Sequence, residues 1–143
     1  MTTTASLRAF IVDDEPLALK RLARMLAATG RVEIVGQATD PEKALAQIAA
    51  QPVDVLFLDI HMPGLTGFQL VGRIPPGPLV VFTTAHDQHA VRAFDVNAID
   101  YLLKPVERER LERALDRAAQ RRAEPGGADL RGANLSGVDL FGA

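Results

Sequence analysis

The sequence predicts an α/β protein with a doubly wound parallel sheet. Short apolar runs alternate with segments of helical period along residues 7–122. Strands that are separated by helices pair in parallel, because a tight turn cannot join parallel neighbours. The chain has 143 residues, 48% of them hydrophobic, which suffices for one core plus a short appendage. A single domain with five strands and five helices is therefore expected.

The domain opens with a strand, a helix and a second strand. Leu7–Val12 is a short run of β-branched, aliphatic and aromatic residues, typical of a buried strand. Residues 15–28 carry apolar side chains on one helical face and basic ones on the other, and Gly30 supplies a stop signal. Val32–Ala38 is the next apolar run, so the second strand is expected there.

The rest of the domain continues this alternation. Asp40 and Pro41 have the residue types of a helix N-cap and first turn, so a helix is expected over residues 40–50. Pro63, Gly64 and Gly67 mark a later loop. The remaining elements are expected as a strand over 53–58, a short helix near 68–72, a strand over 79–83, a helix over 87–94, a strand over 99–103 and a helix over 106–122.

Composition excludes several classes of protein. The length argues against a multidomain enzyme, and the formal net charge of −2 argues against autonomous nucleic-acid binding. The absence of cysteine excludes disulfides, thiolate metal sites and a cysteine nucleophile. The first apolar run is too short for a membrane span and lacks the basic start of a signal peptide. A cytoplasmic location without membrane attachment is expected.

Functional groups follow four of the predicted strands. Asp13 and Asp14 follow the first, Asp59 the third, Thr84 the fourth and Lys104 the fifth. In open parallel sheets the carboxyl ends of the strands form the binding edge, so these groups are expected to meet there. Gathered carboxylates repel one another unless a cation is present. Oxygen donors without neighbouring His or Cys ligands favour a hard cation. The small number of these donors suggests Mg²⁺, which keeps several water ligands when it binds to proteins.

This combination suggests a chemical reaction. A carboxylate beside Mg²⁺ and an ammonium, with a hydroxyl opposite, can attack phosphorus while the new oxyanions are stabilised. The residues therefore indicate formation of an aspartyl phosphate.

Four motifs resemble those of response-regulator receiver domains. IVDDE, LFLDIHMPGLTG, VFTTAHD and DYLLKP occur in the order and strand positions of that family, within residues 7–122. The resemblance implies a flavodoxin-like (βα)5 fold with strand order 2-1-3-4-5. It also implies a sensor histidine kinase or a small phosphodonor as partner. The segment AVRAFDVNAIDYLLKP is most similar to receivers that are joined to LytTR-type DNA-binding domains.

The resemblance also implies residue roles. Asp59 would be the phosphoacceptor, and Thr84 and Lys104 would contact the phosphoryl group. The metal ligands would be Asp13, Asp14, Asp59 and the backbone carbonyl of His61. Further implied roles are a cis peptide bond at Pro105, a switch aromatic at Tyr101, and control of the phosphate lifetime by His61 and His86.

Other interpretations remain open at this point. Asp13 and Asp14 could be an N-cap pair, and Asp59 could be a turn residue. A zinc site at His86 and His89 lacks a third protein ligand, so it is not expected. The whole chain could instead be a constitutive interaction or dimerisation module that does not depend on phosphorylation, or a phosphohydrolase. Against a phosphohydrolase, the sequence offers no second acid to protonate a leaving group.

The composition changes at residues 124–127, EPGG, after which ADLRG, ANLSG and VDLFG repeat every five residues. These repeats resemble the pentapeptide-repeat pattern. The expected division is a receiver domain over residues 1–124 and a tail over 125–143. Three repeats cannot bury their own apolar side chains, so these must dock on something or remain mobile: Leu130, Leu135, Leu140 and Phe141.

A homodimer is expected through the helix over 87–94, the strand over 99–103 and the last helix. That face mixes apolar with acidic and basic side chains, which suits a twofold contact in which each acid meets a base of the partner. The charged residues expected on it are Arg92, Asp95, Asp100, Glu107, Arg108 and Arg110.

Overall fold

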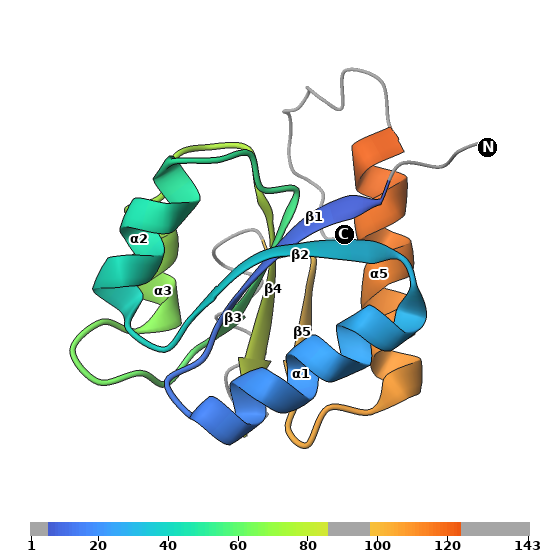
Figure 1. Ribbon diagram of the computed structural model, residues 1–143, viewed down its shortest axis with the longest axis horizontal. Coiled ribbons are helices and arrows are strands. Elements are labelled where there is room, and N and C mark those ends of the chain that lie inside the picture. Colours follow the sequence, from blue (N-terminus) through green and yellow to red (C-terminus); the bar gives the residue numbers. More distant parts are fainter. Residues whose placement is uncertain (1–5, 86–97, 124–143) are drawn as a thin grey trace.

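The computed structural model describes residues 6–85 and 98–123 of the chain. These residues form a five-stranded parallel sheet in the order β2-β1-β3-β4-β5, which confirms the predicted fold class and strand order (Figure 1). In chain order the elements are β1 Leu7–Val12, α1 Pro16–Thr29, β2 Val32–Ala38, α2 Pro41–Ala49, β3 Val55–Asp59, α3 Gly67–Val71, β4 Leu79–Thr84, β5 Asp100–Leu103 and α5 Arg108–Ala123.

Helices cover both faces of the sheet. α2 and α3 pack on one face, and α1 and α5 pack on the other (Figure 1). Side chains of β1 alternate between the two faces: Phe10 and Val12 lie with α2 and α3, while Ala9 and Ile11 lie with α1 and α5. β3 is buried along its whole length, which explains why its sequence is continuously apolar up to Asp59.

The helix boundaries follow local signals in the sequence. α1 begins with Pro16 in its first turn and ends at Thr29. Gly30 caps it with a φ of 68°, a left-handed conformation that glycine adopts without strain. The Asp40 side chain accepts a hydrogen bond from the Glu42 amide and caps α2. α3 has a capping box in which Thr66 and Gln69 each bind the other's backbone amide.

Most boundaries lie within one residue of expectation, and two differ by two residues. β3 begins at Val55 rather than Val53, because the side chain of Asp54 accepts the Arg8 amide hydrogen bond at 2.8 Å and so replaces one rung of the ladder. α5 begins at Arg108 rather than Val106, after the turn at Pro105. The helix expected over 87–94 lies outside the described residues. None of the described helices combines the length and the apolar character that crossing a membrane requires.

Candidate functional site

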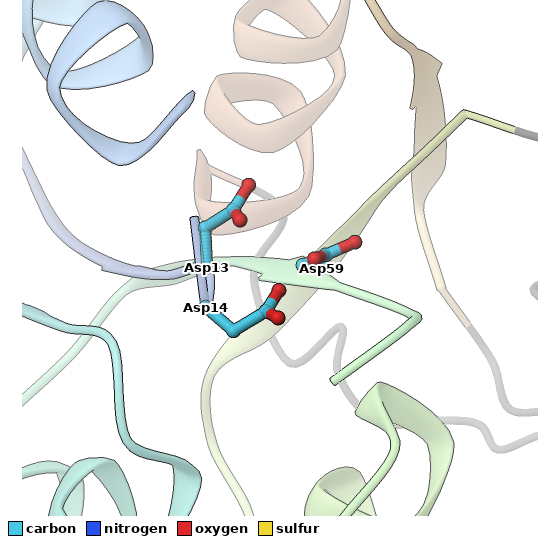
Figure 2. Close-up of side chains that lie close together, drawn as sticks. All are labelled: Asp13, Asp14 and Asp59. Carbon is cyan, nitrogen blue, oxygen red and sulfur yellow. The ribbon is translucent and has the colours of Figure 1, made fainter. Parts of the chain in front are cut away.

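Three carboxylates meet at the carboxyl ends of β1 and β3. Asp13 and Asp14 follow β1 directly, and Asp59 is the last residue of the adjacent strand β3 (Figure 2). One oxygen of each carboxylate lies within 4.8 Å of the others. Asp13 is 3% exposed and Asp59 is 4% exposed, whereas Asp14 is partly exposed. The sheet therefore brings together the acidic residues that the sequence singled out.

Backbone contacts hold the two buried carboxylates in place. Asp13 Oδ1 accepts a hydrogen bond from the Glu15 amide at 2.9 Å, and Asp59 Oδ1 accepts one from the His61 amide at 3.3 Å. Behind Asp59, α3 approaches the backbone closely at Gly67. A Cβ atom on Gly67 would lie 2.6 Å from the Asp59 carbonyl oxygen, so only glycine fits without a shift. The start of α3 thus packs directly on the backbone of Asp59.

Lys104 is the cation of the described site. Its Nζ lies 2.9 Å from Asp13 Oδ2, 3.5 Å from Asp59 Oδ2 and 3.5 Å from Glu15 Oε1. The backbone amide of Lys104 donates to the Thr84 carbonyl at 2.7 Å, and the Lys104–Pro105 peptide bond is cis. One ammonium is therefore shared among three carboxylates that come from two strand ends.

Burial and charge crowding shift the pKa values of this cluster. The pKa of Asp59 is raised to about 7, first by burial and then by the charge of Asp13, against the opposing attraction of Lys104. The pKa of Lys104 is also raised: burial acts to lower it, but the ion pairs with Asp13, Asp59 and Glu15 together outweigh burial. A single lysine does not neutralise this concentration of acid.

The other predicted residues occupy different positions around the cluster. Thr84 is fully buried at the end of β4. Tyr101, in β5, is partly buried and packs against the core on the α2 and α3 side of the sheet. His61 follows β3 and is exposed, while His86 and His89 lie outside the described residues.

Sequence reasoning missed two contributors to the site. Glu15 was not expected to pair with Lys104, although it belongs to the acidic run after β1. The sequence pattern predicts a loop at Gly67, whereas Gly67 is the first residue of α3 and lies against Asp59. The glycine in the segment GLTG, eight residues after Asp59, was the available signal.

The donor set fits Mg²⁺. All three side chains offer carboxylate oxygens, and these oxygens can approach one ion together. Burial, followed by the charge of Asp13, raises the pKa of Asp59, and an added cation would oppose both effects. The residues that would hold Mg²⁺ are Asp13, Asp14 and Asp59.

Comparison with known proteins gives consistent matches. A family model described as the response regulator receiver domain matches residues 9–116. An uncharacterized response regulatory protein of Vibrio vulnificus is 45% identical over 116 residues, which are 80% of this chain and 48% of that protein. The transcriptional regulatory protein BtsR of Escherichia coli is 42% identical over 120 residues, covering 82% of this chain and 50% of BtsR. The chain thus spans about half the length of these curated relatives.

Solved structures match the fold over nearly their whole length. The response regulatory domain of mrkE from Klebsiella pneumoniae has a TM-score of 0.72 and 35% identity, covering 80% of this chain and 96% of that domain. The REC domain of AraT from Geobacillus stearothermophilus has a TM-score of 0.73 and 27% identity, covering 82% of this chain and 96% of that domain.

Proposed function

This chain belongs to the response regulator receiver domain family, and from that premise we propose that Asp59 is its phosphoacceptor. The observation that carries the proposal is the setting of Asp59. Its carboxylate is buried at a strand end, with Asp13 and Asp14 on one side and the Lys104 ammonium 3.5 Å away. A carboxylate that is buried beside a second acid costs the folded protein stability, and groups perturbed in this way are concentrated at functional sites.

In the proposed reaction an oxygen of Asp59 attacks the phosphorus of the donor. The bond from phosphorus to the donor nitrogen or oxygen breaks, and the donor leaves with the bonding electron pair. Asp59 must be ionised to attack, so the attraction of Lys104, which lowers the pKa of this carboxyl, favours the reactive form. When bound, Mg²⁺ would supply further positive charge that offsets the acidic repulsion and stabilises the phosphoryl oxygens.

Lys104 and Thr84 are proposed to receive the new phosphoryl group. The ammonium of Lys104 already lies near Asp59. It can weaken its ion pair with Asp13 and form one with a phosphoryl oxygen instead. Thr84 ends the neighbouring strand and offers a hydroxyl donor. Tyr101 follows on the next strand and would respond to movement of Thr84. We propose that His61 and His86 control access of water and hence the lifetime of the phosphate.

The donor is proposed to be the phosphohistidine of a sensor kinase or a small phosphodonor. The chain itself would catalyse only its own phosphorylation and dephosphorylation. Phosphorylation adds about −1.5 to −2 charge at this edge of the sheet, which can shift a nearby two-state element. The output is then an altered interaction surface. The alternative of a constitutive scaffold gains no support from the relatives, which are named as regulators.

Intact-mass spectrometry with a small phosphodonor tests the assignment. One phosphoryl group should be added in Mg²⁺, and labelling should stop in excess chelator and in an Asp59→Asn variant. Asp40→Asn is the matched control, because asparagine retains the N-cap of α2 and Asp40 does not belong to the cluster of Asp13, Asp14 and Asp59. Undiminished labelling of Asp59→Asn would refute the phosphoacceptor, and equal labelling in chelator would refute the metal.

A further inference from the structure

A second feature lies at the opposite, amino-terminal edge of the sheet. A hollow of about 290 Å³ is bordered by the end of α2 and by the segments that lead into β3 and β4. Its lining is rich in proline and aliphatic side chains, and Pro52, Pro75 and Pro76 are exposed. The volume is at the lower limit of small-molecule pockets, which suits one or two apolar side chains.

The last turn of α5 is fixed to the rim of this hollow. Arg122 donates to Asp54 Oδ1 at 2.7 Å and to the Gly77 carbonyl at 3.2 Å. Asp54 is itself held, because its other oxygen accepts the Arg8 amide at 2.8 Å. This arrangement connects the ends of three elements that lie far apart in the sequence. The described chain therefore ends, at Ala123, beside the hollow.

Residues 124–143, which follow α5, combine turn-forming residues with large apolar side chains. Pro125 cannot continue a helix, and Gly126 and Gly127 permit a sharp change of direction. Beyond them the repeats carry large apolar side chains, of which Leu130 comes first. The segment also carries three acids and one arginine, whereas the last turn of α5 is basic.

We propose that this hollow binds the chain's own C-terminal segment, with Leu130 of the first repeat as the anchoring side chain. Six residues lie between Ala123 and Leu130, and the seven steps from one to the other can span at most about 25 Å, so the lining is within reach. Leu130 is favoured over Leu135 and Leu140 because a shorter closed loop loses less conformational entropy. The acids of the segment then lie near Arg121 and Arg122.

The site is remote from the phosphorylation chemistry. The hollow borders the start of β3, whereas Asp59 ends that strand. Docking of the segment requires neither Mg²⁺ nor phosphate, so its test is independent of the proposed function. Docking would hold the start of the C-terminal segment, directly after α5, against this edge of the sheet.

Paramagnetic broadening in the full chain tests the proposal. The chain has no cysteine, so a Ser136→Cys variant carries a nitroxide at one position. The amide signals of Gln51 and Gly77 should lose most of their intensity. Adding Leu130→Ser should restore these signals, whereas the matched Leu140→Ser should not. Broadening that persists unchanged in Leu130→Ser would overturn the proposal.

Two further measurements test the location of the site and whether the segment docks on its own chain. Ala49→Glu places a charge in the lining and should release the segment, whereas Ala46→Glu, on an exposed position of the same helix outside the lining, should not. Mixing spin-labelled chains with isotope-labelled chains that lack the nitroxide should give no broadening. Broadening in the mixture would mean that the segment docks on a second copy, which would also overturn the proposal.

Discussion

At the scale of single residues, the acidic cluster costs the folded protein stability, because carboxylates are buried close to one another. Asp59 is buried beside Asp13, and one lysine is shared among three carboxylates. The sequence predicted the identity of the carboxylates and of Lys104, because each directly follows an apolar strand. It did not predict the sharing with Glu15, because the distance between strand ends depends on the sheet.

Asp59→Asn should raise the stability of the metal-free protein. A carboxyl whose pKa is raised in the folded state to about 7 binds its proton more tightly when folded, so the free energy of unfolding falls as the pH rises from about 4 to about 7. The variant should remove this fall, which is at most about 4 kcal/mol. Urea denaturation in chelator at pH 5 and pH 8 measures it. An equal pH dependence in both proteins would contradict the assignment.

Lys104→Met should slow phosphorylation more at pH 7 than at pH 8.5. Loss of the ammonium removes the attraction that lowers the pKa of Asp59, so a smaller fraction of Asp59 is ionised near neutrality. The variant should also uncouple phosphorylation from the surface change. Labelling rates at the two pH values measure the first effect, with Lys43→Met on the exposed part of α2 as control. A uniform loss at both pH values would argue against the pKa mechanism.

At the scale of elements, α3 packs directly against Asp59, the proposed phosphoacceptor. Its capping box fixes the first turn, and Gly67 donates a backbone hydrogen bond to the Ile60 carbonyl at 2.9 Å. The same glycine lies against the Asp59 carbonyl. A helix of only five residues therefore helps to set the backbone position of the proposed phosphoacceptor.

Gly67→Ala should destabilise the protein by about 1 to 3 kcal/mol and slow phosphorylation, because the new methyl group displaces the Asp59 backbone. Gly72→Ala, at the end of the same helix, meets only ordinary contacts at a helical φ of −67° and should be neutral or stabilising. Thermal unfolding and labelling rates compare the two variants. Equal stability and equal rates would show that α3 does not position Asp59.

At the scale of the whole molecule, the face formed by β5 and α5 differs in one respect from the sequence-based expectation. Asp100 was expected on the surface, where it would meet a base of a second copy. Instead it is 2% exposed, and its Oδ1 lies 3.0 Å from Arg110 and 3.2 Å from Arg117 of its own chain. Asp100 thus ties α5 to β5 and is not available to a partner. The helix expected over 87–94 lies outside the described residues, so the homodimer remains a prediction.

Phosphorylation should favour that homodimer by the few kcal/mol typical of coupling between two sites. Within the described part of the face, Leu103 is a large apolar side chain that is 46% exposed on β5. Leu103→Glu should therefore weaken the dimer formed with beryllofluoride, a phosphoryl mimic. Leu17→Glu, at an exposed position of α1, is the control. Sedimentation measures the association, and monomers at every accessible concentration in both states would refute the prediction.

The sequence alone determined the elements and the set of polar groups that gather at one edge of the sheet. Apolar periodicity, the Asp40 cap and the Gly30 stop each operate within a few residues, so helices and strands could be predicted close to their observed bounds. The order of strands then placed Asp13, Asp14, Asp59, Thr84 and Lys104 at one edge.

Only the tertiary structure decided the contacts between remote segments: the sharing of Lys104 with Glu15, the burial of Asp100, and the pairing of Arg122 with Asp54 across 68 residues. Such contacts leave no periodic signal, because they depend on how packed elements bring distant side chains together.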